Sequence, residues 1–221
     1  MSGTGAVALF AAAFVATHLL MSHPLRAPLV ARLGERGFSA AYSAVSFATF
    51  IPMVLARRNS GPEASLWVVP DWAWLAATLL MWFASILLTG SFVRNPATAS
   101  MAGAQVRIGE PHGVFRITRH PMMWSFALWA LTHMLVHPEP SALIIAAAIL
   151  ILALVGAAEQ DRKKERQLGE AWSSWEERTS FVPFGRGLAS PGLFALLAGT
   201  VLFVALTWLH PFPTGVWRWL A

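Results

Sequence analysis

Histidine is the residue type in this chain best suited to chemistry, because a neutral imidazole can ligate a metal or transfer a proton. His18 and His133 each lie about a turn or more inside an apolar run, AAAFVATHLLM and ALWALTHMLV. Ionisable residues within membrane-spanning segments usually face the bundle interior and have a partner or a function. These two imidazoles are therefore the first candidates for a site. Four other histidines fall at or near the ends of apolar runs, where a solvated ring is expected: His23, His112, His137 and His210.

Two buried imidazoles favour a shared cofactor site. Each ring has a simpler alternative, a hydrogen bond to a carbonyl or to the adjacent hydroxyl of Thr17 or Thr132. The chain has no cysteine and few carboxylates in its apolar runs, so a zinc site is poorly supplied with ligands. Haem needs only one or two imidazoles and an apolar slot. Among metal cofactors, haem fits these residues best.

The sequence TRHP forms a separate candidate site. Arg119 and His120 come directly before Pro121, a residue favoured in the first turn of a helix. Free N–H groups at a helix start, together with Arg116 and Arg119, can bind an anion. Ordinary anchoring of basic residues at the inner membrane surface is the alternative.

The elements that position these residues are membrane helices. Hydrophobic residues make up 56% of the 221 residues and charged residues only 12%, whereas a soluble domain is about one quarter charged. The net charge of +5 comes from short segments between apolar runs rather than from a continuous basic stripe, so nucleic-acid binding is not expected. The N-terminal run has no Lys or Arg before it, so we expect a retained span rather than a signal peptide.

About six runs approach the length needed to cross a bilayer. Lipid obliges each crossing segment to satisfy its own backbone groups, which predicts an all-α integral membrane bundle forming a single domain over 1–221. The expected transmembrane helices lie near 5–21, 39–55, 72–92, 120–136, 142–158 and 192–209.

The basic residues predict the orientation of these spans. With an external N-terminus, the inner connectors hold 13 Lys and Arg residues and the outer segments hold 3. Both termini are then outside (periplasmic), and a bacterial inner membrane is the expected location. Within the inner connectors, the segment around 159–180 places Leu168, Trp172 and Trp175 on one helical face. That spacing favours an amphipathic helix on the inner membrane surface, or a helix packed on the bundle.

Four stretches resemble the NnrU family of bacterial membrane proteins, over nearly the whole chain. They are THLLMSHPLRAPLVARLGERGF, RNPATASMAGAQ, GVFRITRHPMMWSFALWALTHMLVH and LGEAWSSWEERTSFVPF. The family is similar to 15-cis-zeta-carotene isomerase, a membrane enzyme with haem b. The NnrU family takes its name from an association with denitrification and nitric-oxide metabolism.

The resemblance implies haem b held by two histidines, which match His18 and His133; His23 competes with His18 for the first match. Depth raises a difficulty, because His18 lies near the inner end of its span while His133 lies about 18 Å beyond the start of its helix. His120 matches the depth of His18 more easily and stays as a reserve ligand.

The RHP motif followed by VPF also resembles the isoprenylcysteine and methanethiol methyltransferases. That resemblance implies S-adenosylmethionine bound near His120, Arg119 and Glu165 at the inner face. Met122 and Met123 replace the usual aromatic residue after the motif, and KKERQLG replaces paired glutamates, which weakens this alternative.

The sequence therefore favours a haem-b protein in the lipid bilayer that isomerises a polyene or another lipophilic small molecule. Trp124, Phe126 and Trp129 are candidates to line its slot. A methyltransferase acting on a small or lipidic thiol, and a haem sensor or electron carrier without enzymatic activity, are the alternatives.

Overall fold

A computed structural model describes residues 3–96 and 108–220, and in these ranges every regular element is helical. Part of the RNPATASMAGAQ stretch and the inner-connector Arg107 lie outside the described residues. The elements are α1 (Gly3–Ser22), α2 (Arg26–Arg58), α3 (Asp71–Gly90), the 3₁₀ turn η2 (Gly113–Arg116), α4 (Pro121–Val136), α5 (Pro140–Leu168), α6 (Glu170–Arg178), α7 (Leu193–Trp208) and the 3₁₀ turn η3 (Gly215–Trp219).

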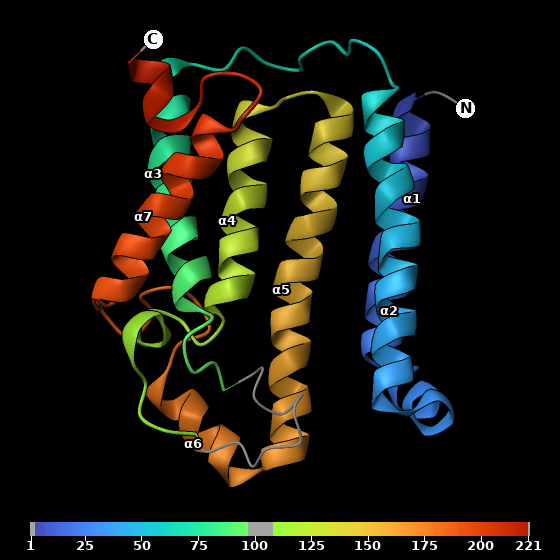
Figure 1. Cartoon of the computed structure of the whole chain (residues 1–221), viewed down its shortest axis with the longest axis vertical. Coiled ribbons are helices and arrows are strands. Elements are labelled where there is room, and N and C mark those ends of the chain that lie inside the picture. The colour runs from blue at the N-terminus through green and yellow to red at the C-terminus, as the bar shows by residue number, and fades with distance from the viewer. Residues whose placement is uncertain (1–2, 97–107, 221) are drawn as a thin grey trace.

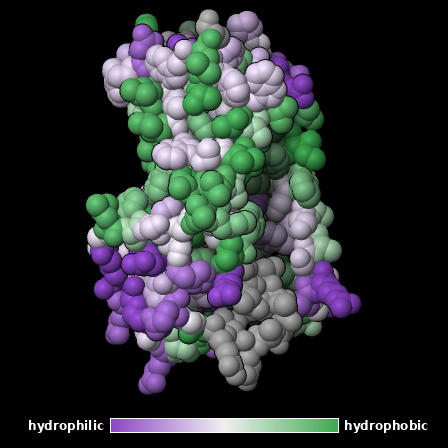
Figure 2. Space-filling view, turned by 60° about the vertical axis from the view of Figure 1, so that its left-hand side comes forward, coloured by the Kyte–Doolittle hydropathy of each residue, from purple (hydrophilic) through white to green (hydrophobic). Residues whose placement is uncertain are grey.

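The chain is a helical membrane bundle, as its hydropathy predicts. Helices α1, α2, α3 and α5 are long and apolar enough to cross a membrane, and α4 and α7 are shorter apolar helices of 16 residues. These six helices cover the six expected runs. Figure 2 shows a broad hydrophobic surface over the helices, with hydrophilic residues at both ends and most of them at the lower end.

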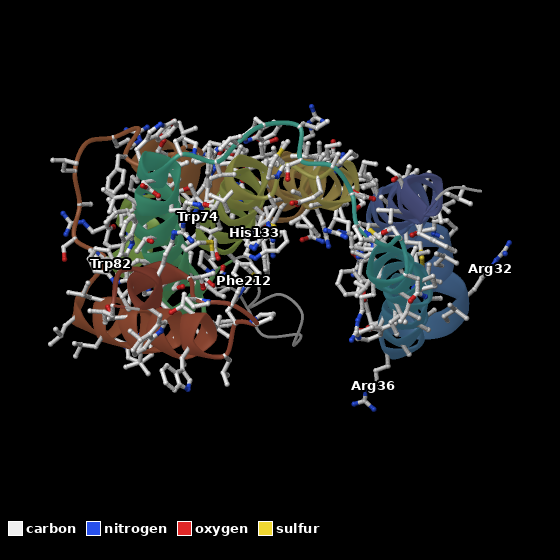
Figure 3. All side chains as sticks on the ribbon, turned by 90° about the horizontal axis from the view of Figure 1, so that it is seen from above. Arg32, Arg36, Trp74, Trp82, His133 and Phe212 are labelled. Atoms are coloured by element: carbon white, nitrogen blue, oxygen red, sulfur yellow. The ribbon has the colours of Figure 1, made fainter. Side chains whose placement is uncertain are left out.

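The helices pack in the order α2, α1, α5, α4, α3, α7, so that α2 and α3, which follow each other in the sequence, lie on opposite sides of α5. Seen from above, they form a curved layer with the α1–α2 pair on one side and α7 on the other (Figure 3). Helix α5 is the link between the two groups because it packs against both α1 and α4.

Both termini lie at the same end of the bundle, here named the termini end, and α6 lies at the opposite end, named the α6 end (Figure 1). An even number of crossings requires this arrangement. The unequal charge distribution is also preserved. Of the described Lys and Arg residues, Arg57, Arg58 and Arg218 belong to segments at the termini end and the rest to segments at the α6 end.

Helix α2 begins earlier than its apolar run because it includes a short helical segment before a kink at Gly34. Gly34 has φ 70° and ψ 169°, a backbone conformation that a residue with a side chain rarely adopts. The segment before this kink was expected to be a connector and is a short helical arm instead. Arg32 and Arg36 flank the kink and point away from the bundle (Figure 3).

The α6 end has a well-packed core of its own. Trp172 and Trp175 on α6 are fully buried against a cluster that includes Leu87 of α3 and Phe115 of η2. Of the two expected arrangements for this segment, α6 therefore has the one that packs its apolar face on the bundle.

A carboxylate in the α2–α3 connector joins two helices at the termini end. Glu63 accepts hydrogen bonds from the Ser141 backbone N–H (2.9 Å) and hydroxyl (2.8 Å), and another from the Thr4 hydroxyl (2.9 Å). Burial alone raises the pKa of Glu63, but these hydrogen bonds outweigh it and leave that pKa below 4.5. Glu63 thus caps the start of α5 and ties it to α1.

Candidate functional site

A partly open cavity of about 490 Å³ lies where α1, α2, α4 and α5 meet. Its volume is in the range of small-molecule and cofactor sites. The lining is mostly apolar, and its polar groups gather toward the α6 end. The lining residues are Phe14, His18, Leu19, Ser22, His23, Tyr42, Met123, Phe126, Ile149, Leu152, Ala153, Gly156, Gln160 and Lys163.

Helix α5 forms the largest part of the cavity wall with one face. Ile149, Leu152, Gly156, Gln160 and Lys163 follow one another at intervals of three or four residues, which places them on one side of an α-helix. A Cβ atom added at Gly156 has no heavy atom within 4 Å, so this glycine leaves open space in the wall. The face changes from aliphatic at Ile149 to polar at Gln160 and cationic at Lys163.

His18 lines this cavity with its imidazole ring held in a fixed orientation. Its Nδ1 lies 2.9 Å from the carbonyl oxygen of Phe14, so Nδ1–H donates and the lone pair is on Nε2. Nε2 lies 3.2 Å from the hydroxyl of Ser46, but that hydroxyl is only 2.7 Å from the Tyr42 carbonyl. Because one hydroxyl has one proton, the shorter contact to Tyr42 competes with His18 for it, and Nε2 accepts at most a weak, shared hydrogen bond. Metal-binding histidines commonly donate the other ring N–H to a carbonyl, as Nδ1 does here.

His133 has a similarly anchored ring in a different part of the bundle. Its Nδ1 lies 2.8 Å from the Trp129 carbonyl oxygen, and its ring stacks between Trp129 (4.0 Å between centroids) and His137 (5.5 Å). His137 in turn contacts Phe212, and Figure 3 shows His133 and Phe212 on the same side of α4. This aromatic cluster is at the termini end. His133 lies seven residues beyond Phe126, the last α4 residue in the cavity lining, or about 10 Å along the helix.

The structure therefore does not bring His18 and His133 to one cavity, and it relates His18 more closely to His120. The Nδ1 of His120 lies 3.2 Å from the Gln160 side-chain oxygen, and Gln160 lines the same cavity as His18. The His120 side chain itself is fully buried behind this wall, with Nε2 2.9 Å from Oδ1 of Asp161.

Arg119 and His120 share a buried ionic cluster. The Arg119 guanidinium lies 2.8 and 2.9 Å from Oδ2 of Asp161 and 3.1 Å from Oε1 of Glu176. Burial and the neighbouring Asp161 carboxylate raise the pKa of Glu176 to about 7, although Arg119 opposes this rise. The cluster joins the start of α4 to α5 and α6.

The RHP segment is also fixed by the loop that follows α6. Arg119 N–H donates to the Ser180 carbonyl (2.8 Å), and the Thr118 hydroxyl and Trp124 indole both donate to the Phe181 carbonyl (2.7 Å each). The expected anion-binding corner is thus occupied by the chain's own carboxylates, while Arg116 is exposed elsewhere.

Several residues of the cavity were missed from the sequence. Gly156, Gln160 and Lys163 lie in or just beyond a run that hydropathy identifies only as a span, and their periodic spacing with Ile149 and Leu152 was the available signal. Of the aromatic residues expected to line a slot, Phe126 does line the cavity. Trp124 instead packs against the core at the α6 end, and Trp129 stacks on His133. Within 3–96 and 108–220, no group of three or more His, Asp or Glu side chains is arranged to hold a metal ion.

Comparison with known proteins relates this chain to plant carotenoid enzymes. It is 29% identical over 161 residues to the chloroplastic 15-cis-zeta-carotene isomerase of Zea mays, covering 69% of this chain and 42% of that protein. It is 26% identical over 201 residues to the chloroplastic 15-cis-zeta-carotene isomerase of Arabidopsis thaliana, covering 83% of this chain and 53% of that protein. The chain thus spans about half the length of the curated relatives it matches. No solved structure matches it at a significant level.

The family model for the NnrU protein matches residues 6–218, which include all residues that line the cavity and all of the membrane helices except the first residues of α1. The chain belongs to the NnrU family.

Proposed function

We propose that this chain is a haem-b-dependent isomerase of a carbon–carbon double bond in a polyene or a similar lipophilic molecule. The observation that carries the proposal is His18, which lines a mostly apolar cavity of about 490 Å³ and whose Nδ1–H is fixed on the Phe14 carbonyl, so that Nε2 carries the lone pair. The similarity to 15-cis-zeta-carotene isomerases supports the reaction class.

The residues of the cavity fit a haem. The donor is a neutral imidazole whose orientation is set by the Phe14 carbonyl, and the walls near it are aromatic and aliphatic. Open space beside Gly156 allows a flat group to approach the α5 backbone closely. When bound, haem b supplies an iron that acts as a Lewis acid or a transient electron donor toward a double bond.

The chain's own residues hold and shield the reactants. His18 provides the ligand nitrogen, and Phe14 fixes its tautomer through the backbone. Phe126 and Leu152 contribute an apolar lining that excludes water and accepts a hydrocarbon chain.

His133 stays the second histidine that would hold the haem, on the basis of the family resemblance. Its Nδ1 is anchored to a backbone carbonyl as that of His18 is, which supports it. Its position about 10 Å beyond the cavity along α4 is the reason that we rank it below His18. His120 stays the reserve ligand, although Gln160 and Asp161 already face both of its ring nitrogens.

The methyltransferase alternative loses support from the same geometry. S-adenosylmethionine was expected near Arg119, His120 and Glu165, but Arg119 is engaged by two carboxylates and His120 is fully buried. Between an isomerase and a haem sensor or electron carrier, a cavity wide enough for a ligand beside His18 favours the isomerase. Residence in a bacterial inner membrane and a link to denitrification belong to the proposal as expectations from the family.

Cavity filling tests the proposal. Gly156→Leu adds bulk to the cavity at a position where no protein atom obstructs it, so the fold is retained and helix propensity improves. We expect this variant, reconstituted with haem, to convert a 15-cis polyene to its trans form at less than about one tenth of the wild-type rate, because one misplaced contact at a site costs an order of magnitude or more. Val155→Leu adds bulk on the exposed face of the same helix and is the matched control. Equal isomerisation by both variants, or none by the wild type, contradicts the proposal.

A further inference from the structure

The cavity changes from apolar to cationic along its length, and this gradient has a consequence for the ligand. At one end lie Phe14, Ile149 and Leu152, and at the other lie His23, Gln160 and Lys163. From Ile149 to Lys163 the α5 wall extends about 21 Å. A ligand that fills this space must itself be apolar at one end and polar at the other.

Lys163 is the cation of the polar end. Its side chain is partly buried in the cavity wall, and its charged neighbours include Arg26 and Glu35, a pair in which Nη2 of Arg26 donates to both carboxylate oxygens. Because Glu35 is engaged by Arg26 at 2.9 Å, it neutralises Lys163 incompletely. An ammonium group held away from bulk water in this way attracts an anion.

The other polar groups of this end are hydrogen-bonding neighbours rather than competing charges. His23 lies 3.7 Å from Glu159, and burial is the main cause that lowers the pKa of His23, so its ring is largely neutral at pH 7. Gln160 contributes an amide whose oxygen faces His120. No carboxylate is among the lining residues in the described part of the chain, and Glu159 and Glu35 lie just behind His23 and Lys163, so Lys163 is the charged side chain that the lining itself presents.

We propose that Lys163, with His23 and Gln160 beside it, binds a carboxylate of the ligand that occupies this cavity. The ligand class is a lipophilic carboxylic acid, whose apolar body lies toward Phe14 and Ile149. This inference rests on the proposed function for the identity of the ligand, since haem b has two propionate groups. A fatty acid has the same chemistry and is the second possible source of the carboxylate.

Carboxylate recognition is measured by comparing each acid with its ester. Full-length protein in a neutral detergent is titrated with haem and with haem dimethyl ester, and binding is followed by the Soret band. We expect wild type to bind haem about tenfold more tightly than the diester, because a hydrogen-bonded ion pair shielded from water contributes about this much. Lys163→Gln removes the preference, and Lys163→Arg retains it. Arg166→Gln, which removes an exposed charge three residues further along α5, is the control and keeps the preference.

A second pair of ligands separates the two sources of the carboxylate. Radiolabelled oleate and methyl oleate are bound to the same variants in nanodiscs. A preference for oleate that depends on Lys163, in protein that binds no haem, supports the carboxylate site and overturns the haem proposal. Equal binding of haem and its diester by wild type and Lys163→Gln overturns the carboxylate site, even where the His18-dependent spectrum is intact. Thermal unfolding of each variant verifies that it is folded.

Discussion

Replacement of Asp161 tests how much the ionic cluster around Arg119 and His120 contributes to the stability of the fold. Asp161 is 9% exposed and faces two partners, Arg119 at 2.8 and 2.9 Å and His120 at 2.9 Å. Asp161→Asn keeps the shape of the side chain and removes its charge. The guanidinium of Arg119, 14% exposed, is then left with Glu176 alone.

The expected loss follows from this geometry. Removing one partner of a buried ion pair costs about 3–5 kcal/mol, and Glu176 at 3.1 Å recovers part of it, so we expect the free energy of unfolding to fall by about 3 kcal/mol. Asp161→Asn combined with Glu176→Gln leaves Arg119 without a carboxylate. The double variant therefore loses about 1 kcal/mol more than the sum of the single losses, since the two carboxylates compensate for each other.

The assay is unfolding by sodium dodecyl sulfate in mixed micelles, followed by far-ultraviolet circular dichroism. Glu35→Gln, which removes the 66% exposed partner of Arg26, is the control, and exposed ion pairs contribute less than about 1 kcal/mol. If Asp161→Asn is no less stable than Glu35→Gln, the cluster does not hold α4, α5 and α6 together and this reasoning is refuted.

Three further predictions concern other parts of the fold. The pKa of Glu176 is raised to about 7 in the folded chain, so its contribution to stability is complete below pH 4.5 and is lost as the pH rises through 7. Glu176→Gln should therefore flatten the decline in wild-type stability across this pH range. An unchanged slope would exclude Glu176 as the cause of the decline. Glu63→Gln should lower the free energy of unfolding by about 1–2 kcal/mol, measured as above, because a charged acceptor at the Ser141 N–H and hydroxyl becomes a neutral one. Gly199→Leu should separate α7 from α3, because even a Cβ atom at this position would lie 2.5 Å from Cα of Ile86. The distance between spin labels attached to the two helices measures this separation. An unchanged distance would argue against close packing at Gly199.

The membrane helices were predictable because hydropathy acts on each segment separately. Runs such as 72–92 and 142–158 correspond to α3 and α5 within a few residues at the apolar parts, since lipid imposes the same length requirement on every span. The arm before Gly34 was not predictable, because its helical state depends on a single φ of 70° between two helical segments. Periodicity along α5 was visible in the sequence, but only the packing against α1 and α4 makes that face a cavity wall.

The candidate site was predictable only in part, for a similar reason. His18 was selected because it lies in an apolar run, and it lines the cavity. The partner of Arg119 and His120 was not predictable, since Asp161 lies about forty residues away and at the end of a different helix. Contacts of this range depend on the packing order of the helices, which no local pattern in the sequence contains.

The visible absorption spectrum of the purified protein shows whether His18 holds a haem. Wild type and His18→Ala are expressed with ample haem, purified in the same detergent, and measured oxidised and reduced. Haem ligation by His18 predicts a Soret band in wild type that is lost or strongly shifted in His18→Ala, while His112→Ala, in a connector outside the cavity, keeps the wild-type spectrum. A wild-type protein without haem, or a His18→Ala variant with an unchanged spectrum, would contradict it.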